Sequence, residues 1–275
     1  MKPARFDYIR AGTIAEAHAA LAKDGDEARI IAGGQSLVPM LSMRMARPAV
    51  LIDIMHLSEL SKIEVRGNAI RVGAGVRQAE LLAWPELAER QPLLADALPW
   101  VGHAQTRSRG TLCGSAAHAD PSAEIPLALL ALKGSVELSS QRERRRVAAE
   151  DFFTGLLSTA RNDNELIEAI DIPCRAAGHG YAFREFARRH GDFAIVACAA
   201  IARTDGVRLA IGGAADVPTA REFPNLDNDA LDDALDEFAA ELEPRDDLHA
   251  TADYRRALVR RLGRATIEEA RRCRA

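Results

Sequence analysis

The sequence has few cysteines, few aromatic residues and no long apolar run. It contains four cysteines, none of them in a C-x-x-C pair: Cys113, Cys174, Cys198 and Cys273. Because zinc sites and iron–sulfur clusters need closely spaced thiolates, this spacing argues against either one, and we expect four reduced thiols. No stretch approaches the length of a membrane span or a signal segment. We therefore expect a cytoplasmic chain that does not span a membrane.

An excess of positive charge is also lacking. The 36 basic and 40 acidic side chains give a net charge of −4, so nucleic-acid binding is not indicated. The basic run Gln141–Arg145 has no aromatic neighbours and is best interpreted as a solvated hairpin tip. His103 and His190 have no partner at metal-ligand spacing, so we expect no metal site. The remaining composition, 48% hydrophobic and 28% charged, is that of a soluble globular chain.

The first fifty-odd residues alternate between strand and helix signals. Phe6–Ile9, Arg29–Ala32 and Pro48–Ile54 are apolar runs typical of buried strands. Thr13 with Glu16 forms a capping box that predicts a helix start, and a second helix is expected over Leu37–Met45. This order predicts a small α/β unit.

The pattern then changes to hairpins and short helices. Ile63–Val72 contains the turn pair Gly67-Asn68 and predicts a hairpin. Gln78–Ala83 and Glu86–Leu98 are expected to be helical, with breaks at prolines. Ser135–Ala148 predicts a second hairpin, and Leu166–Pro173 a strand that ends at proline. Beyond a linker, further strands and two helices, Leu231–Leu242 and Ala252–Arg272, predict a second α+β unit.

A glycine pair in Val72–Gln78 imitates a dinucleotide fingerprint. Gln78 occupies the place of the third glycine, and no acidic residue follows at the end of a second parallel strand. We interpret the segment as the end of a hairpin strand, which argues against a Rossmann NAD domain.

Two glycine-rich bends carry the functional signal. In Ile30–Leu37 an apolar strand breaks at Gly33-Gly34, where positive φ is permitted and no Cβ covers the main chain. Successive N–H groups there can form a concave anion site. A tight strand-to-helix turn that binds nothing explains the stretch about equally well.

The second bend spans His103–Glu124. It is long, rich in small and hydroxyl residues, and lies between apolar segments. Thr111 and Ser115 add hydroxyls to main-chain donors, which suits close approach to a polar ligand. A packed crossing of two elements is the alternative. Two such bends in different units favour a pyrophosphate held between them.

Four segments together resemble a known family. AGGQSLVPMLSMR with RPAVLIDI, RGTLCGSAAHADPSAEIP, HGDFAIV and ADYRRALVRRL occur in the order found in the FAD-binding medium subunit of molybdenum hydroxylases, of the carbon monoxide dehydrogenase and xanthine dehydrogenase type. The resemblance covers essentially the whole chain. It implies an α+β fold, with a two-subdomain FAD-binding domain of the vanillyl-alcohol oxidase / p-cresol methylhydroxylase type and a small C-terminal α+β domain. The implied boundaries are 1–56, 57–175 and 176–275.

The resemblance also implies the cofactor contacts. The first bend wraps the FAD diphosphate and the second completes that contact, which assigns Ile31, Ala32, Gly33, Gly34, Gln35, Ser36, Leu37, Val38, Thr111, Leu112, Cys113, Gly114 and Ser115. Val101 borders the flavin, Glu124 hydrogen-bonds the cofactor, and Ile167 meets the adenine end through its backbone. Arg184 stands where relatives often carry lysine, near the flavin ring, and Phe193 lines the ring.

Two further details qualify this assignment. Cys113 replaces a glycine frequent in the family pattern, and we interpret it as a small buried hydrophobe rather than a redox thiol. His118 and Asp120 invite interpretation as a catalytic dyad, but structural hydrogen bonding within the loop is the better hypothesis because FAD carries the chemistry. We assign no catalytic residue and no metal ligand.

The implied function is an electron-transfer flavoprotein subunit. A large partner subunit carries the molybdenum cofactor, a small partner carries two [2Fe-2S] clusters, and electrons pass from the clusters through FAD to an external acceptor. The implied assembly is a dimer of heterotrimers. A free-standing FAD-dependent oxidoreductase and a flavin-free docking subunit remain as alternatives. The sequence gives neither the substrate nor the terminal acceptor.

Overall fold

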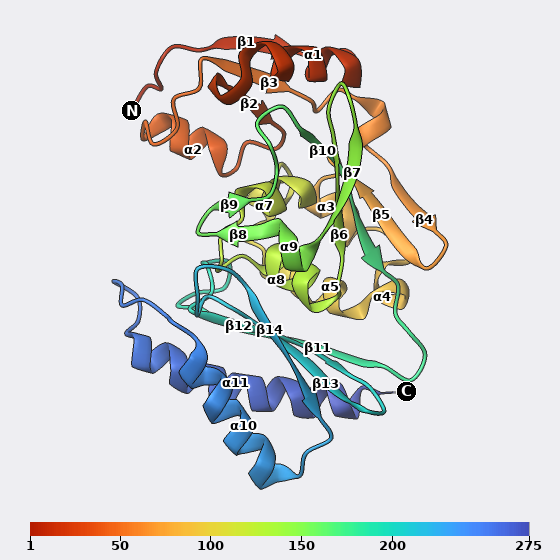
Figure 1. Cartoon of the computed structure of the whole chain (residues 1–275), viewed down its shortest axis with the longest axis vertical. Coiled ribbons are helices and arrows are strands. Elements are labelled where there is room, and N and C mark those ends of the chain that lie inside the picture. Colours follow the sequence, from red (N-terminus) through yellow and green to blue (C-terminus); the bar gives the residue numbers. More distant parts are fainter. Residues whose placement is uncertain (275) are drawn as a thin grey trace.

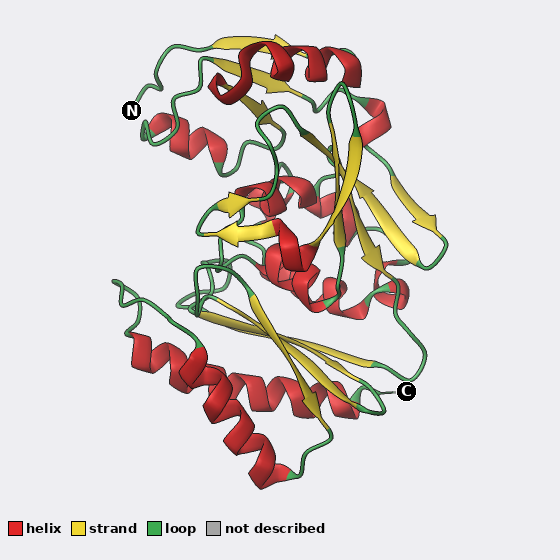
Figure 2. Cartoon of the chain, viewed as in Figure 1, coloured by secondary structure: helices red, strands yellow, loops and turns green. Residues whose placement is uncertain are grey.

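The computed structural model describes residues 1–274 as a mixed helix and strand structure with three main sheets. Figure 1 shows them one above another along the longest axis, with the N-terminal sheet and the C-terminal sheet at opposite ends. Helices lie between and around the sheets, and Figure 2 separates them from the strands by colour.

The N-terminal sheet is parallel, as the alternation of strands and helices predicts. Its strand order is β1-β3-β2. Its elements are β1 (Asp7–Arg10), α1 (Ile14–Asp24), the 3-10 helix η1 (Gly25–Glu27), β2 (Ala28–Ile31), α2 (Leu37–Ser42) and β3 (Val50–Asp53). The Thr13 hydroxyl accepts from the Glu16 N–H at 3.1 Å, which confirms the predicted helix start. The expectation that the second helix reaches Met45 is wrong, because the chain turns at Arg44 with φ of 59°.

The middle sheet is antiparallel, in the order β4-β5-β10-β6-β7. Both predicted hairpins are confirmed, and the first turns at Gly67 with φ of 60°. The strands of this sheet are β4 (Ile63–Arg66), β5 (Ala69–Gly73), β6 (Ser135–Ser139), β7 (Arg144–Ala148) and β10 (Leu166–Pro173). The 3-10 helix η2 (Ser58–Leu60) precedes β4, and β8 (Phe153–Gly155) and β9 (Ser158–Thr159) form a separate small pair. Its helices are α3 (Gln78–Leu82), α4 (Leu87–Arg90), α5 (Pro92–Ala97), η3 (Leu98–Trp100), α6 (Ala104–Arg107), α7 (Leu112–His118), α8 (Glu124–Ala131) and α9 (Ala149–Phe152).

The glycine pair that imitates a dinucleotide fingerprint closes a hairpin strand. Gly73 is the last residue of β5, which pairs antiparallel with β4 and β10. A Cβ on Gly73 would lie 2.2 Å from the carbonyl oxygen of Leu60, so glycine is needed for close packing rather than for phosphate. The rejection of a Rossmann domain is therefore confirmed.

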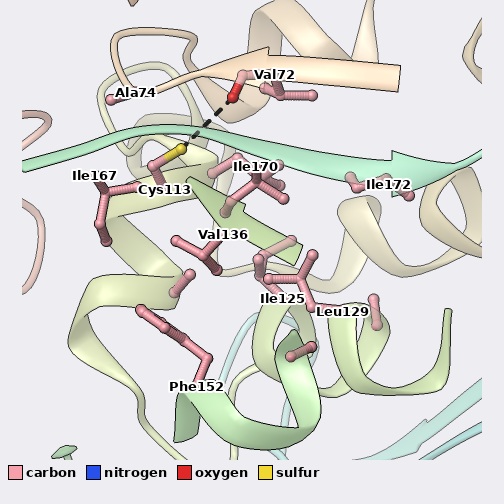
Figure 3. Close-up of a cluster of buried hydrophobic side chains, with 14 of the residues drawn as sticks. Val72, Ala74, Cys113, Ile125, Leu129, Val136, Phe152, Ile167, Ile170 and Ile172 are labelled. Carbon is pink, nitrogen blue, oxygen red and sulfur yellow. Dashed lines mark hydrogen bonds between the residues drawn. The ribbon is translucent and has the colours of Figure 1, made fainter. Parts of the chain in front are cut away.

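The main core lies between the middle sheet and its helices. Figure 3 shows Val136 and Ile170 of the sheet facing Ile125 and Phe152 of helices α8 and α9. Burying such side chains contributes about 1.5–3 kcal/mol each. No helix within residues 1–274 is long and apolar enough to cross a membrane.

The C-terminal sheet is an antiparallel meander in the order β11-β12-β13-β14. Its strands are β11 (Gly180–Phe186), β12 (Val196–Ala202), β13 (Gly206–Gly212) and β14 (Thr219–Pro224), and the helices α10 (Asn228–Glu241) and α11 (Ala252–Arg272) cover one face. The other face meets α5 and α8 of the middle part. Arg208 fastens this contact, because its Nη2 donates to the Leu130 carbonyl at 3.1 Å and to Glu150 Oε1 at 2.7 Å.

Candidate functional site

The two glycine-rich bends touch each other. A Cβ on Gly33 would lie 2.1 Å from the carbonyl oxygen of Arg109 and 2.7 Å from Cα of Gly110. Only a residue without a side chain permits two backbones to come this close. The fold therefore brings together two bends that lie more than seventy residues apart in the sequence.

The first bend presents a row of free main-chain donors. In the described part of the chain, the N–H groups of residues 33–37 make no hydrogen bond to protein. Gly34 has φ of 70°, and Gln35 and Ser36 then lead into the first turn of α2. Alternation of left-handed and right-handed backbone aims successive N–H groups to the same side, which suits an anion. The Gln35 side chain donates to the Gly33 carbonyl at 3.1 Å and braces the bend.

The second bend is more regular than the irregular loop we expect from its sequence. It contains the two short helices α6 and α7. Thr111 caps α7, because its hydroxyl accepts from the Gly114 N–H at 3.0 Å. A Cβ placed on Gly114 would lie 2.8 Å from that same hydroxyl, so a side chain at this position would disturb the cap. Leu112 and Cys113 are buried, so only their backbone can meet a ligand.

Cys113 is a packing residue. Its side chain is 2% exposed, and its thiol donates to the Val72 carbonyl at 3.7 Å (Figure 3). Burial raises the pKa of this thiol to about 12, so it is not a thiolate at neutral pH. The structure thus agrees with a small buried hydrophobe. Asp120 likewise serves the loop, since its Oδ1 accepts from the Ser122 N–H at 2.9 Å.

Arg107 organises the segment that carries Val101. Its Nη1 donates to the carbonyls of Pro99, Val101 and Gly102 at 3.1, 3.0 and 2.9 Å. Hydrogen bonds from a charged donor are the stronger kind, and three of them converge here on one short stretch. They fix this stretch at the base of the second bend.

Glu124 begins α8 and is 3% exposed. Burial raises the pKa of its carboxyl to about 7, Asp120 raises it further, and Arg107 and the Glu124 N–H oppose the shift. A buried carboxyl in this state holds a proton near neutral pH, where an ordinary glutamate does not.

This shift predicts a pH effect on stability. The folded pKa of Glu124 lies above its ordinary value of 4.5, so folding retains a proton that the unfolded chain releases. The contribution of Glu124 to stability is therefore greatest below about pH 4.5 and is lost as the pH rises towards about 7. Urea unfolding at about pH 5 and pH 8 measures this, and Glu124→Gln reduces the loss. The exposed Glu243→Gln is the control, and an equal pH effect in Glu124→Gln and the parent would contradict the assignment.

β11 presents two charged neighbours to opposite sides. Tyr181 and Phe183 face the middle part of the molecule, and Glu185 has the same parity. Arg184 faces the other side, where its Nε donates to Glu269 Oε2 on α11 at 2.7 Å. The flavin contact expected for Arg184 stays a prediction, whereas Glu185 is the charged side chain of β11 on the side of Glu124.

The turn between β11 and β12 packs on the second bend. A Cβ on Gly191, which has φ of 88°, would lie 2.5 Å from the His103 ring. The rings of Trp100 and His190 are 5.0 Å apart. Phe193 follows Gly191 in this turn and is 60% exposed, and its contact with the flavin ring stays a prediction.

Ile167 lies in the core on β10, next to a register shift between Ile167 and Ala169. The structure places it beneath α7, which packs on β10 and β5. Its predicted backbone contact stays a prediction.

A separate cavity of about 640 Å³ lies over the opposite face of the middle sheet. Its arginines are engaged by carboxylates: Arg71 with Glu137 at 2.6 Å, and Arg146 with Asp171 at 2.9 Å. Mutually neutralised charges leave little attraction for a ligand, so we do not place the site there. Within residues 1–274 no group of three His, Cys, Asp or Glu side chains could hold a metal ion.

Sequence reasoning missed two side chains of this region, Arg107 and Glu185. Glu185 had a detectable signal, because it continues the apolar alternation of Tyr181 and Phe183 on one face of a strand. Arg107 had none, since its partners are backbone carbonyls that no residue type marks.

Comparisons with known proteins agree with these features. A family described as the FAD binding domain in molybdopterin dehydrogenase matches residues 4–175, and the CO dehydrogenase flavoprotein C-terminal domain matches residues 181–270. The chain is 40% identical to the nicotine 6-hydroxylase medium subunit of Paenarthrobacter nicotinovorans, over 98% of this chain and 99% of that protein. It is 33% identical to the carbon monoxide dehydrogenase medium chain of Hydrogenophaga pseudoflava, over 98% of each.

Solved structures give the same result. A chain of carbon monoxide dehydrogenase from Hydrogenophaga pseudoflava superposes with a TM-score of 0.94 at 33% identity, covering 100% of both chains. A chain of quinoline 2-oxidoreductase from Pseudomonas putida 86 gives 0.92 at 33% identity, covering 99% of both. The chain therefore belongs to the FAD-binding medium subunits of the molybdenum hydroxylase family, of the carbon monoxide dehydrogenase type.

Proposed function

We propose that this chain transfers electrons through FAD from the [2Fe-2S] clusters of a small partner subunit to an external acceptor. The observation that carries the site assignment is the contact of Gly33 with Arg109, which joins the two bends beneath one row of free N–H groups. The large partner carries the molybdenum cofactor at which substrate is hydroxylated. The names of the relatives, medium subunit and medium chain, support such an assembly, and we propose a dimer of heterotrimers.

The residues present fit FAD. Its diphosphate needs several donors and little added bulk. Residues 33–37 offer free N–H groups, and Gly33, Gly34 and Gly114 add no side chain. Bound FAD supplies the ability to accept and release electrons, and the protein supplies orientation and electrostatics. In this proposal Glu124 hydrogen-bonds the cofactor, Val101 borders the flavin, and Phe193 lines its ring. No general base or nucleophile in this chain is required.

This proposal includes the type of fold and the limits of its parts. The N-terminal parallel sheet and the middle antiparallel sheet correspond to the two subdomains of a vanillyl-alcohol oxidase / p-cresol methylhydroxylase type FAD domain, over residues 1–56 and 57–175. Residues 176–275 form the C-terminal domain. The separation of the three sheets supports this division.

The experiment is isolation of the affinity-tagged chain from its own host, followed by flavin and metal analysis. We expect about one FAD per chain, together with two co-purifying subunits that contain iron and molybdenum. A flavin-free preparation would contradict the proposal and favour a docking subunit. Steady substrate turnover by the chain without partners would favour a free-standing oxidoreductase.

Capping of α7 gives a second test. Thr111→Ala removes the acceptor for the Gly114 N–H and should cost about 1 kcal/mol of stability. Because Gly114 belongs to the proposed cradle, FAD retention should also fall several-fold. Thr13→Ala removes the corresponding cap of α1 and should cost a similar amount without loss of FAD. Equal FAD retention in both variants would argue against a role of the second bend.

A further inference from the structure

Glu185 carries the most conspicuous unsatisfied group in the described chain. Both of its carboxyl oxygens are buried, and neither has a hydrogen-bond partner within residues 1–274. Other buried carboxylates have partners: Glu165, for example, accepts from Arg145 at 2.6 Å. Burying a carboxylate without donors is costly, so a group outside this chain must meet Glu185, or it must carry a proton, or both.

The position of Glu185 in the sheet points to the site. In β11, β12 and β13 the residues Glu185, Ala197 and Gly212 form one row across the sheet. This row runs beneath the segment before α8, because the N–H of Gly213 donates to the Pro121 carbonyl at 2.8 Å and Gly212 lies against the same oxygen. Glu185 therefore faces the start of α8, where Glu124 lies.

Among the described residues, no cation is found to act on Glu185. The sheet row contributes only alanine and glycine beside it. Glu124 is the charged group that acts on Glu185, and it raises the pKa of Glu185, which burial already raises to about 8. Glu124 is in turn influenced by Asp120 and Arg107. Two adjacent buried carboxyls cannot both ionise cheaply, so the pair retains a proton at neutral pH.

We propose that Glu185 is a cofactor-contacting residue, which as a neutral carboxylic acid donates a hydrogen bond to an acceptor of the bound FAD. This inference rests on the proposed function. It explains why a carboxyl occupies the apolar face of β11: its missing partner is the cofactor. A carboxylic acid kept neutral by its site can donate where a carboxylate can only accept.

The inference makes FAD affinity depend on pH in a defined direction. If the protonated form of Glu185 binds FAD, affinity is constant below the pKa of the free site, about 8, and falls above it by up to about tenfold per pH unit. Glu185→Gln keeps a donor that does not titrate, so the fall in affinity above about pH 8 should disappear in this variant, and any change near pH 7 that remains belongs to Glu124. Glu185→Leu removes the donor and should bind FAD about tenfold more weakly at pH 7.

The test measures FAD dissociation constants by flavin fluorescence between about pH 6 and pH 10. The protein is the native assembly, depleted of flavin and titrated with FAD, and the exposed Glu243→Gln serves as the matched control. Loss of the pH dependence in Glu185→Gln alone is the expected result. Equal pH dependence in the parent and Glu185→Gln would overturn the inference and leave the proposed function standing. Failure of the parent to bind FAD at any pH would overturn both.

Discussion

We expect Gly33→Ala to abolish stable FAD binding while the rest of the fold survives. The added Cβ would lie 2.1 Å from the carbonyl oxygen of Arg109, and that oxygen belongs to backbone, which cannot rotate away as a side chain could. The two bends must separate. Such overpacking costs about 3 kcal/mol, and because the strain falls on the cradle we expect FAD affinity to fall by at least about a hundredfold. Flavin content after gel filtration and urea unfolding measure the two effects.

Gly155→Ala is the matched control for this variant. Its new Cβ would meet only the Ser158 side chain at 3.9 Å, an ordinary van der Waals contact, and Gly155 lies on β8 outside the two bends. Flavin content and stability should remain close to those of the parent. Full flavin retention by Gly33→Ala would show that the contact between the bends is not required.

Arg107→Met has the second large expected effect. It removes the donor that holds the carbonyls of Pro99, Val101 and Gly102, and leaves these partly buried acceptors without a partner. We expect a loss of about 2–3 kcal/mol in unfolding free energy. Because Val101 and the base of the second bend lose their support, FAD affinity should fall by about tenfold or more. Urea denaturation and FAD titration measure both.

Arg107→Lys separates the hydrogen bonds from the general effect of a positive charge. An ammonium group offers three donors and should restore part of the stability, although it lacks the planar geometry of guanidinium. Arg5→Met removes an exposed arginine in the segment before β1, outside both bends, and controls for net charge. Equal stability of Arg107→Met and Arg5→Met would show that the hydrogen bonds from Arg107 to the three carbonyls do not stabilise the fold.

Much of the fold is predictable because local signals and tertiary structure agree. The capping box at Thr13, the turn pair at Gly67 and the apolar runs of β2 and β3 each specify their element without help from distant residues. The glycine pair at Gly33 also carried a local signal, because only a special backbone needs two such residues. The strand β14 carried no such local signal, since its sequence TAREFP lacks a clear alternation of apolar residues.

The remaining errors concern contacts between distant segments. Helix α7 in the second bend forms because the Thr111 cap and the core packing of Leu112 outweigh a composition typical of loops. The alternation of Tyr181 and Phe183 indicates which face of β11 Glu185 shares. That this face meets the segment before α8 depends on long-range contacts, such as the hydrogen bond from Gly213 to the Pro121 carbonyl, which no local signal in β11 records.

Hydrogen–deuterium exchange with and without FAD tests the central claim most directly, because the claim concerns main-chain N–H groups. Residues 33–37 donate to no protein acceptor in the described chain, so they should exchange fast without cofactor. We predict that FAD slows exchange in peptides covering residues 33–37 and in peptides covering residues 111–115, both in the same titration. Protection confined to other segments, such as the charged cavity around Arg71 and Arg146, would contradict the account.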